Sequence, residues 1–228
     1  TFGGYLPSTE VLTELNGVFE DYESKYYKFG FILIDVNTGA GISYNVDRNF
    51  YSASSIKGPY AISLAKYNQD AAENYENTII NMLVESDNDA FRILHNNYHN
   101  QYIMQWCEEC YVDPEVCRWK YPKISCRDLT RIWVNCYDYL ITDPYGETMA
   151  SYLDHPTYSL IHSELGEMYT TWSKAGWLQD DDPSHTTTVD AGVVFAANGP
   201  YIVIIESTVP MNIDPLRPLM QALNNAHD

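Results

Sequence analysis

The sequence predicts a mixed α/β (α+β) fold, with a five-stranded antiparallel sheet built from both ends of the chain and flanked by helices. Two segments with strand character lie near the start of the chain, three lie near its end, and helical periodicity fills the part between them. We therefore expect a discontinuous sheet domain, residues 1–54 and 168–228, around an inserted all-helical domain, residues 55–167. The five predicted strands are residues 29–36, 42–46, 168–176, 186–197 and 201–209.

The first elements follow from local patterns. Residues 9–24 place apolar side chains at helical spacing and predict an amphipathic helix ahead of the sheet. The first two strands are separated by Asn37-Thr38-Gly39, residues that favour a tight turn, so they are expected to form a hairpin.

The middle of the chain is predicted to be helical. A helix over 55–67 tolerates Pro59 because the missing N–H costs little near a helix start. A loop rich in cysteine, proline and charge is expected over 110–124. The remaining predicted helices of this region are residues 76–84, 87–99, 103–109 and 127–140.

The last elements complete the sheet. Asn198-Gly199-Pro200 predicts a tight turn between the final two strands, and residues 214–226 are expected to close the chain as a helix. The sequence shows no internal repeat and no low-complexity linker.

Composition narrows the class of protein. The chain has 228 residues, 45% of them hydrophobic, which describes a folded globular protein with ample core. Its net charge of −18 repels phosphate backbones, so we expect no nucleic-acid partner. No apolar run is long enough to span a membrane. We expect a monomer that is exported to the cell envelope or the extracellular medium.

The cysteines are clustered, and three interpretations of the cluster are open. In an exported protein they predict a local staple of two disulfides and one free thiol. The Cys107-x-x-Cys110 spacing also suits a zinc site, which two further cysteines could complete. Unpaired buried thiols are the third interpretation. The five cysteines are Cys107, Cys110, Cys117, Cys126 and Cys136.

The motif Ser54-Ser55-Ile56-Lys57 places a hydroxyl and an amine three residues apart at a predicted helix start. That spacing puts both groups on one face, where an amine can activate a serine nucleophile. A second pair with the same spacing, Ser63 and Lys66, lies nine residues further on. Nine residues are two and a half helical turns, so the second pair faces away from Ser54 and is predicted not to be catalytic.

Two further motifs follow in order. Ser86-Asp87-Asn88 lies in the turn between two predicted helices, and Lys174-Ala175-Gly176 lies on a predicted strand. Taken alone, Ser86-Asp87-Asn88 is also a common helix cap, and Lys174-Ala175-Gly176 is compatible with a strand bulge.

In this order the three motifs resemble those of the serine β-lactamase and penicillin-binding protein superfamily, most closely the class A β-lactamase-like branch. The resemblance implies a β-lactamase/transpeptidase-like fold over the whole chain. It implies that Ser54 attacks a carbonyl to form an acyl-enzyme and that neutral Lys57 takes its proton. Ser86 then relays a proton to the leaving nitrogen, and Asn88 binds the amide side chain of the substrate.

The resemblance also assigns the strand residues. The backbone N–H groups of Ser54 and Trp177 form the oxyanion hole. Lys174 supplies positive potential for a substrate carboxylate, while Ala175 and Gly176 line the substrate site. This chemistry requires no cofactor and no metal.

Three departures from the family pattern concern substrate binding and deacylation. Ala175 replaces the usual hydroxyl residue, and the strand over 186–190 has no arginine for a substrate carboxylate, although Arg217 could substitute. No deacylating glutamate is followed four residues on by asparagine in the segment between the second and third motifs. The glutamates tested against that pattern are Glu108, Glu109 and Glu115, and none fits it.

The acidic run Asp180-Asp181-Asp182 could hold calcium or be a solvated loop, and His185 could line the cleft or lie on the surface. The sequence thus predicts a serine hydrolase that forms an acyl-enzyme at Ser54 on a β-lactam or a cell-wall peptide amide. The alternatives are a catalytically weak or inactive module of the same fold that binds or senses such molecules, and a cysteine-clamped or zinc-bearing interaction domain.

Overall fold

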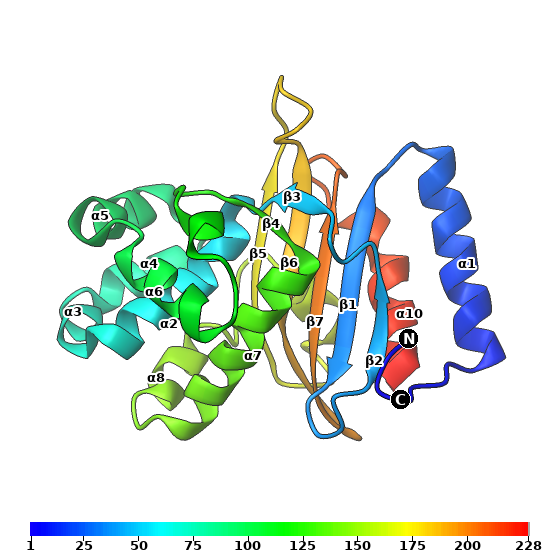
Figure 1. Cartoon of the computed structure of the whole chain (residues 1–228), viewed down its shortest axis with the longest axis horizontal. Coiled ribbons are helices and arrows are strands. Elements are labelled where there is room, and N and C mark those ends of the chain that lie inside the picture. Colours follow the sequence, from blue (N-terminus) through cyan, green and yellow to red (C-terminus); the bar gives the residue numbers. More distant parts are fainter. Residues whose placement is uncertain (228) are drawn as a thin grey trace.

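The computed structural model describes residues 1–227 and confirms the predicted five-stranded antiparallel sheet (Figure 1). Strand β1 pairs with β7, in a register that places Phe31 opposite Ile205 and so joins the two ends of the chain. The sheet order is β2-β1-β7-β6-β5. The strands are β1 (Phe29–Asp35), β2 (Gly41–Tyr44), β5 (Thr171–Leu178), β6 (Thr187–Ala196) and β7 (Gly199–Ser207).

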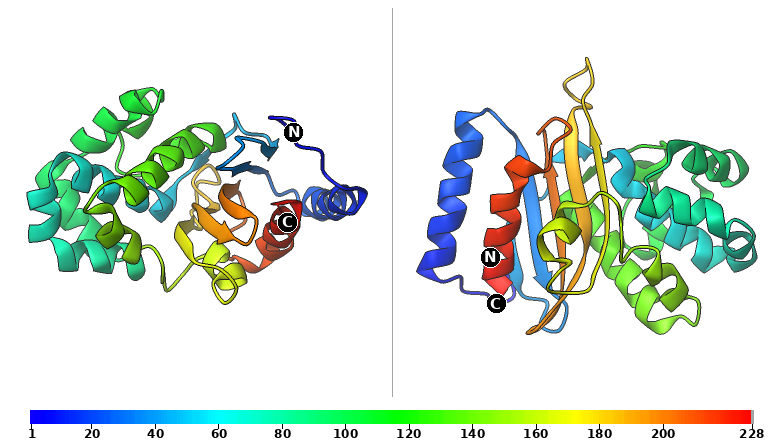
Figure 2. Two further views of the ribbon diagram at one scale, coloured as in Figure 1. Left: turned by 90° about the horizontal axis from the view of Figure 1, so that it is seen from below. Right: turned by 180° about the vertical axis from the view of Figure 1, so that it is seen from behind.

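The central strands are covered on both faces. Strand β7 is buried continuously from Tyr201 to Ser207, as its run of apolar residues requires. Helices α1 (Thr9–Ser24) and α10 (Arg217–His227) lie side by side over one face, opposite the main group of helices (Figure 2). A core of aromatic and aliphatic side chains, Phe31 and Leu223 among them, lies beneath these two helices.

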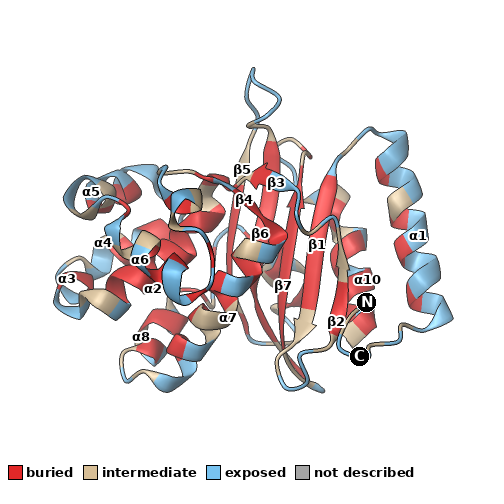
Figure 3. Ribbon diagram, viewed as in Figure 1, coloured by how far each residue is buried: buried red, intermediate tan, exposed pale blue. Residues whose placement is uncertain are grey.

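Helix α2 (Lys57–Tyr67) is the centre of the helical side, and its residues from Lys57 to Ala65 are all buried (Figure 3). Its sequence is apolar nearly all round, as expected of a helix enclosed by others. The helices around it are α3 (Gln69–Asn74), α4 (Glu76–Val84), α5 (Asn88–Tyr98), α6 (Gln101–Glu109), α7 (Cys126–Thr142) and α8 (Gly146–Ser151).

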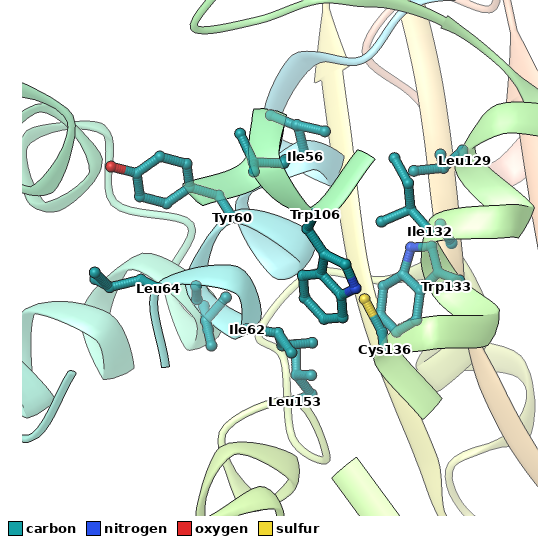
Figure 4. Close-up of a cluster of buried hydrophobic side chains, with 14 of the residues drawn as sticks. Ile56, Tyr60, Ile62, Leu64, Trp106, Leu129, Ile132, Trp133, Cys136 and Leu153 are labelled. Carbon is teal, nitrogen blue, oxygen red and sulfur yellow. The ribbon is translucent and has the colours of Figure 1, made fainter. Parts of the chain in front are cut away.

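Large side chains from α2, α6 and α7 interlock in this helical core (Figure 4). Trp106 and Trp133 are both fully buried there, beside Ile62 and the thiol of Cys136. No helix within residues 1–227 combines the length and apolar character that crossing a membrane requires.

The predicted disulfide staple is wrong. All five cysteines, Cys107, Cys110, Cys117, Cys126 and Cys136, are buried free thiols. They behave as small apolar side chains in the core between α6, α7 and the neighbouring 3-10 helix η2 (Pro114–Cys117), the third of the three interpretations. Within residues 1–227, no group of three or more His, Cys, Asp or Glu side chains is placed to hold a metal ion.

Short elements are where sequence patterns and structure differ most. The expected loop over 110–124 contains η2 and ends in β4 (Lys123–Ser125), which pairs with β3 (Asn49–Tyr51) in a second small sheet. Helix α9 (Leu160–Leu165) packs on β5 and β6 and was not expected. Strands of three residues and helices of six are too short to show a period.

Glu206 on β7 is a fully buried carboxyl whose pKa is raised well above its usual value, chiefly by burial and also by the charge of Asp128. The Cys126 thiol donates a hydrogen bond to its Oε2 at 3.2 Å, while Oε1 has no partner. The folded state therefore holds a proton that the unfolded carboxyl releases above a pKa of about 4.3. Folding stability falls as pH rises from that value toward the raised folded-state pKa, by about 1.4 kcal/mol per pH unit.

We expect Glu206→Gln, which mimics the protonated carboxyl, to lose less stability than the unsubstituted protein between pH 5 and pH 8. Denaturant unfolding at the two pH values measures the difference. Glu23→Gln, at an exposed position, serves as the control and should keep the original pH dependence. Equal pH dependence in all three proteins would show that Glu206 is ionised in the folded state.

Candidate active site

Ser54 lies in the 3-10 helix η1 (Ala53–Ile56), directly before α2. Its neighbours Ala53, Ser55 and Ile56 are buried, whereas Ser54 is only partly so. Ala53 has a φ of 43°, a left-handed conformation that costs energy for a residue with a Cβ. The Ser55 hydroxyl donates to the Ser52 carbonyl at 2.7 Å and stabilises this turn. The Ser54 that follows this strained residue lines a cavity.

Lys57 connects the first motif to the second. Its ammonium is fully buried and donates to the Ser86 carbonyl at 2.7 Å and to Asn88 Oδ1 at 2.8 Å. Burial, and then the charges of Lys174 and Lys120, lower the pKa of Lys57 to about 7. The amine is thus partly neutral near neutral pH, as a proton acceptor must be. Within residues 1–227 no direct hydrogen bond joins it to the Ser54 hydroxyl.

The second motif is both a helix cap and part of the site. Asp87 caps α5, because its Oδ1 accepts a hydrogen bond from the Ala90 N–H at 2.8 Å. Ser86, just before it, has a φ of 57° and accepts a hydrogen bond on Oγ from the Lys174 ammonium at 2.9 Å. In this strained turn the Ser86 hydroxyl therefore points toward Lys174 of the third motif.

Strand β5 brings the third motif against Ser54. Lys174 is buried, and burial lowers the pKa of its ammonium to about 8 despite the opposing effect of Asp190. A Cβ on Gly176 would lie 2.3 Å from the Ser54 nitrogen, so only glycine allows this approach of the two backbones. The close contact aligns the backbone of β5 with that of η1.

The predicted site residues meet around one cavity of about 220 Å³. Lys57 and Lys174 lie beneath its wall, each hydrogen-bonded to Ser86 or its neighbours. The cavity offers a hydroxyl nucleophile, a poised amine and two converging backbone segments, which is the equipment of acyl transfer. It is lined by Ser54, Glu85, Ser86, Asn88, Tyr158, Ala175, Gly176 and Trp177.

Comparison with known families agrees with this geometry. The model of a family described as the beta-lactamase enzyme family matches residues 64–225. The chain belongs to the beta-lactamase family. The matched segment includes the second and third motifs but begins after Ser54 and Lys57. No curated protein is similar in sequence to this chain.

Solved structures of the beta-lactamase fold resemble the chain along nearly its whole length. A beta-lactamase from Chitinophaga pinensis is 14% identical with a TM-score of 0.75, covering 93% of this chain and 97% of its own. One from Sphaerobacter thermophilus is 15% identical with a TM-score of 0.71, covering 94% of each chain. A variant of PBP-A, in an acyl-enzyme complex with penicillin G, is 16% identical with a TM-score of 0.74, covering 98% and 97%. At these identities the likeness shows the fold.

This member of the beta-lactamase family has site residues that the sequence motifs did not indicate. Asp190 on β6 is fully buried, and burial raises the pKa of its carboxyl to about 6. It accepts hydrogen bonds from the Ser159 hydroxyl at 2.7 Å and the Ile161 N–H at 3.0 Å, and its charge acts on Lys174. A lone charged residue within an otherwise uncharged strand was the signal that could have found it.

None of the three glutamates that were tested against the deacylating pattern, and did not fit it, lines the Ser54 cavity of this beta-lactamase-family protein. Glu109 accepts hydrogen bonds from Lys66 at 2.8 Å and Tyr67 at 2.5 Å, and Glu115 pairs with Arg118. Glu108 is exposed on α6. The carboxylate that does line the cavity is Glu85, which precedes the second motif and which its pattern did not single out.

Other predicted residues have local partners. Arg217 lines a neighbouring cavity, where its guanidinium bonds to Asp214 and Glu164, so it does not reach into the Ser54 cavity. The Ser63 hydroxyl donates to the Tyr60 carbonyl at 2.8 Å inside α2. The acidic run 180–182 forms a hydrogen-bonded turn with Ser184 and Thr186. His185 packs against Tyr51 with ring centroids 4.9 Å apart.

Proposed function

We propose that the chain is a serine hydrolase that forms an acyl-enzyme at Ser54 on a β-lactam or a cell-wall peptide amide. The observation that carries the proposal is the hydrogen-bonded chain from Lys57 to the Ser86 turn and from Lys174 to the Ser86 hydroxyl, built around the cavity that Ser54 lines. A location outside the cytoplasm, where such substrates occur, belongs to the same proposal.

The first half of the reaction uses groups in the cavity wall. Neutral Lys57 takes the proton of Ser54 as Oγ attacks the carbonyl. The backbone N–H groups of Ser54 and Trp177, two residues that line the cavity, stabilise the oxyanion. Lys174 donates to the Ser86 hydroxyl at 2.9 Å, so Ser86 passes its proton to the leaving group and regains one from the Lys174 ammonium, while Lys57 keeps the proton of Ser54.

The second half of the reaction is hydrolysis of the acyl-enzyme, and the base that usually serves it is not in the expected place. A water that hydrolyses the acyl-enzyme needs a base, and the glutamates of the segment between the second and third motifs lie elsewhere. We therefore infer that the acyl-enzyme forms readily and breaks down slowly. The same observation favours the second candidate function, a module that senses β-lactams or cell-wall peptides by becoming acylated.

The test follows intact mass and product release with a reporter penicillin and with a D-alanyl-D-alanine depsipeptide. We expect one adduct per chain, located by peptide mapping on the peptide that contains Ser54, and a slow release of product. An adduct mapped to another residue contradicts the proposal, as does the absence of both adduct and turnover with either substrate. Fast turnover would support the hydrolase as the function and rule out the sensing module.

A further inference from the structure

A large cavity lies near the Ser54 cavity and has no part in the proposed reaction. Its volume is about 570 Å³, against about 220 Å³ for the Ser54 cavity. A small cavity of about 140 Å³ shares Ser54, Asn88 and Trp177 with the Ser54 cavity, and Tyr51 and Tyr121 with the large one. The large cavity, called the remote cavity below, is lined by Tyr51, Glu115, Val116, Trp119, Lys120, Tyr121, Lys123 and His185.

The remote cavity contains lysines that have no carboxylate partner, in a protein whose net charge is −18. Of the 13 basic residues, seven form an ion pair with a carboxylate of residues 1–227. Among the other six, Lys57 and Lys174 lie beneath the wall of the Ser54 cavity. Lys120 and Lys123 line the remote cavity. Positive charge without a carboxylate partner is thus gathered along these two cavities.

The Lys120 ammonium lies against aromatic rings that connect it to the second motif. Its Nζ is 4.8 Å from the ring centroid of Phe91 and 5.4 Å from that of Tyr121. The Tyr121 hydroxyl donates to Asn88 Oδ1 at 3.2 Å, and Lys57 Nζ lies 5.7 Å from the same Phe91 ring. Burial lowers the pKa of the Lys120 ammonium, so an anion placed beside it is stabilising.

Lys123 presents a second ammonium to the remote cavity. It begins β4, and its Nζ donates to the Ser184 hydroxyl at 2.8 Å. Asp182 is near enough to feel this charge, but its carboxylate accepts from the Ser184 N–H at 2.9 Å and lies 3.9 Å from His185. Lys123 therefore has donors left for a ligand, since an ammonium carries three.

The acids beside Lys120 are paired with arginines. Glu115 lines the remote cavity and pairs with Arg118 at 3.2 Å. Asp89 acts on the charge of Lys120 and pairs with Arg92 at 3.0 Å. Neither carboxylate forms an ion pair with Lys120 within residues 1–227, so the remote cavity keeps its positive charge.

The wall of the remote cavity also offers apolar surface. Trp119 is 65% exposed although it lines the cavity, and Tyr51 and Tyr121 lie with ring centroids 6.2 Å apart. Exposed rings of this kind pack against an alkyl chain, while an ammonium binds an anionic end group. The remote cavity therefore fits a chain of methylenes that ends in a carboxylate.

We propose that the remote cavity is a subsite for the acyl part of the substrate and that Lys120 and Lys123 make it select an acyl part that ends in a carboxylate. This rests on the proposed function and on the role that the motif resemblance assigns to Asn88, binding the side-chain amide of the substrate. Asn88 lines both the Ser54 cavity and the small cavity, so the chain beyond that amide extends toward Tyr121. The substrate class is a β-lactam or cell-wall peptide with an acidic group several bonds beyond the amide.

Three penicillins that differ only at the end of the acyl chain test the proposal. Their acyl groups are adipoyl, hexanoyl and 5-aminopentanoyl, in which four methylenes separate the carbonyl from a carboxylate, a methyl or an ammonium. The end groups are remote from the β-lactam ring, so intrinsic reactivity is nearly equal. Intact mass gives the rate of Ser54 acylation at subsaturating concentration. We expect the adipoyl compound to exceed the 5-aminopentanoyl compound by about tenfold at low ionic strength, and by less at high salt.

Substitution of the two lysines tests their role. Lys120→Gln combined with Lys123→Gln should abolish the preference for the adipoyl compound, and the corresponding double change to Glu should invert it. Any effect of Lys120 on the pKa of Lys57 acts on all three compounds and cancels in the ratio. Lys25→Gln combined with Lys28→Gln is the matched control and should keep the ratio, since it removes two exposed lysines that line none of the three cavities.

The outcomes separate this proposal from the proposed function. If all three penicillins acylate Ser54 at similar rates, or if the double change to Gln keeps the ratio, the subsite is wrong and the hydrolase stands. Calorimetric binding of the adipoyl and 5-aminopentanoyl compounds to Ser54→Ala measures the subsite without acylation. A preference for the adipoyl compound there, with no acylation of the unsubstituted protein, would keep the subsite and overturn the hydrolase.

Discussion

Ser54→Ala is expected to abolish the covalent adduct, lowering the rate of acylation by at least about 10³-fold. In the proposed reaction Ser54 supplies the attacking oxygen, and the Ser86 hydroxyl is held by Lys174. The Ser54 side chain is partly exposed. Its removal should leave the thermal unfolding temperature nearly unchanged. Intact mass after incubation with penicillin measures the effect.

Ser63→Ala is the matched control for this substitution, because it removes the other serine that stands three residues before a lysine. Its hydroxyl bonds within α2 and lies away from the cavity. The Ser63→Ala protein should acylate at the original rate. If acylation survives in Ser54→Ala and disappears in Ser63→Ala, the nucleophile is Ser63 and the proposal is wrong.

Lys57→Met is expected to lower the rate of acylation by about 10²–10⁴-fold, the usual contribution of a positioned general base. Methionine is close to lysine in length and lacks the amine. The protein should remain folded, since the ammonium that is lost is fully buried and such groups are costly to desolvate. Rates measured for Lys57→Met at saturating and subsaturating penicillin separate a loss of proton transfer from a loss of binding.

The pH dependence of acylation gives the second readout for Lys57. Because burial and nearby lysines lower its pKa to about 7, the neutral amine predominates only above that value. The rate should rise about tenfold per pH unit below pH 7, level off, and fall above about pH 8 as Lys174 loses its proton. In Lys57→Met the rise near pH 7 should disappear. Lys66→Met, at an ion-paired surface lysine, should keep it.

Much of the fold could be predicted from the sequence because its main elements have clear periods. The first strand and hairpin, the apolar runs of β6 and β7 and the stripe of α7 have bounds close to those expected. The cysteines could not be assigned in this way. Their clustering in sequence is typical of a disulfide framework, but in the structure all five are buried free thiols in the helical core.

The sequence predicted those residues of the candidate site that belong to the three motifs. The structure brings Ser54, Ser86 and Lys174 together as the motif order indicated. Glu85 and Asp190 were missed, because their importance comes from tertiary placement: one lines the cavity and the other lies buried near a lysine. A local pattern cannot show which of many acids will be placed there.

The pairing of β1 with β7 makes the position of Ser54 depend on distant parts of the chain. Ser54 is held by a backbone contact with Gly176, and β5 is in turn held by β6 and β7. Such nonlocal pairing raises contact order and slows folding. During folding, β1 remains an unpaired edge strand of the β1–β2 hairpin until it pairs with residues about 170 positions further along the chain. Acylation competence therefore becomes a late reporter of folding, one that appears only after the sheet has closed.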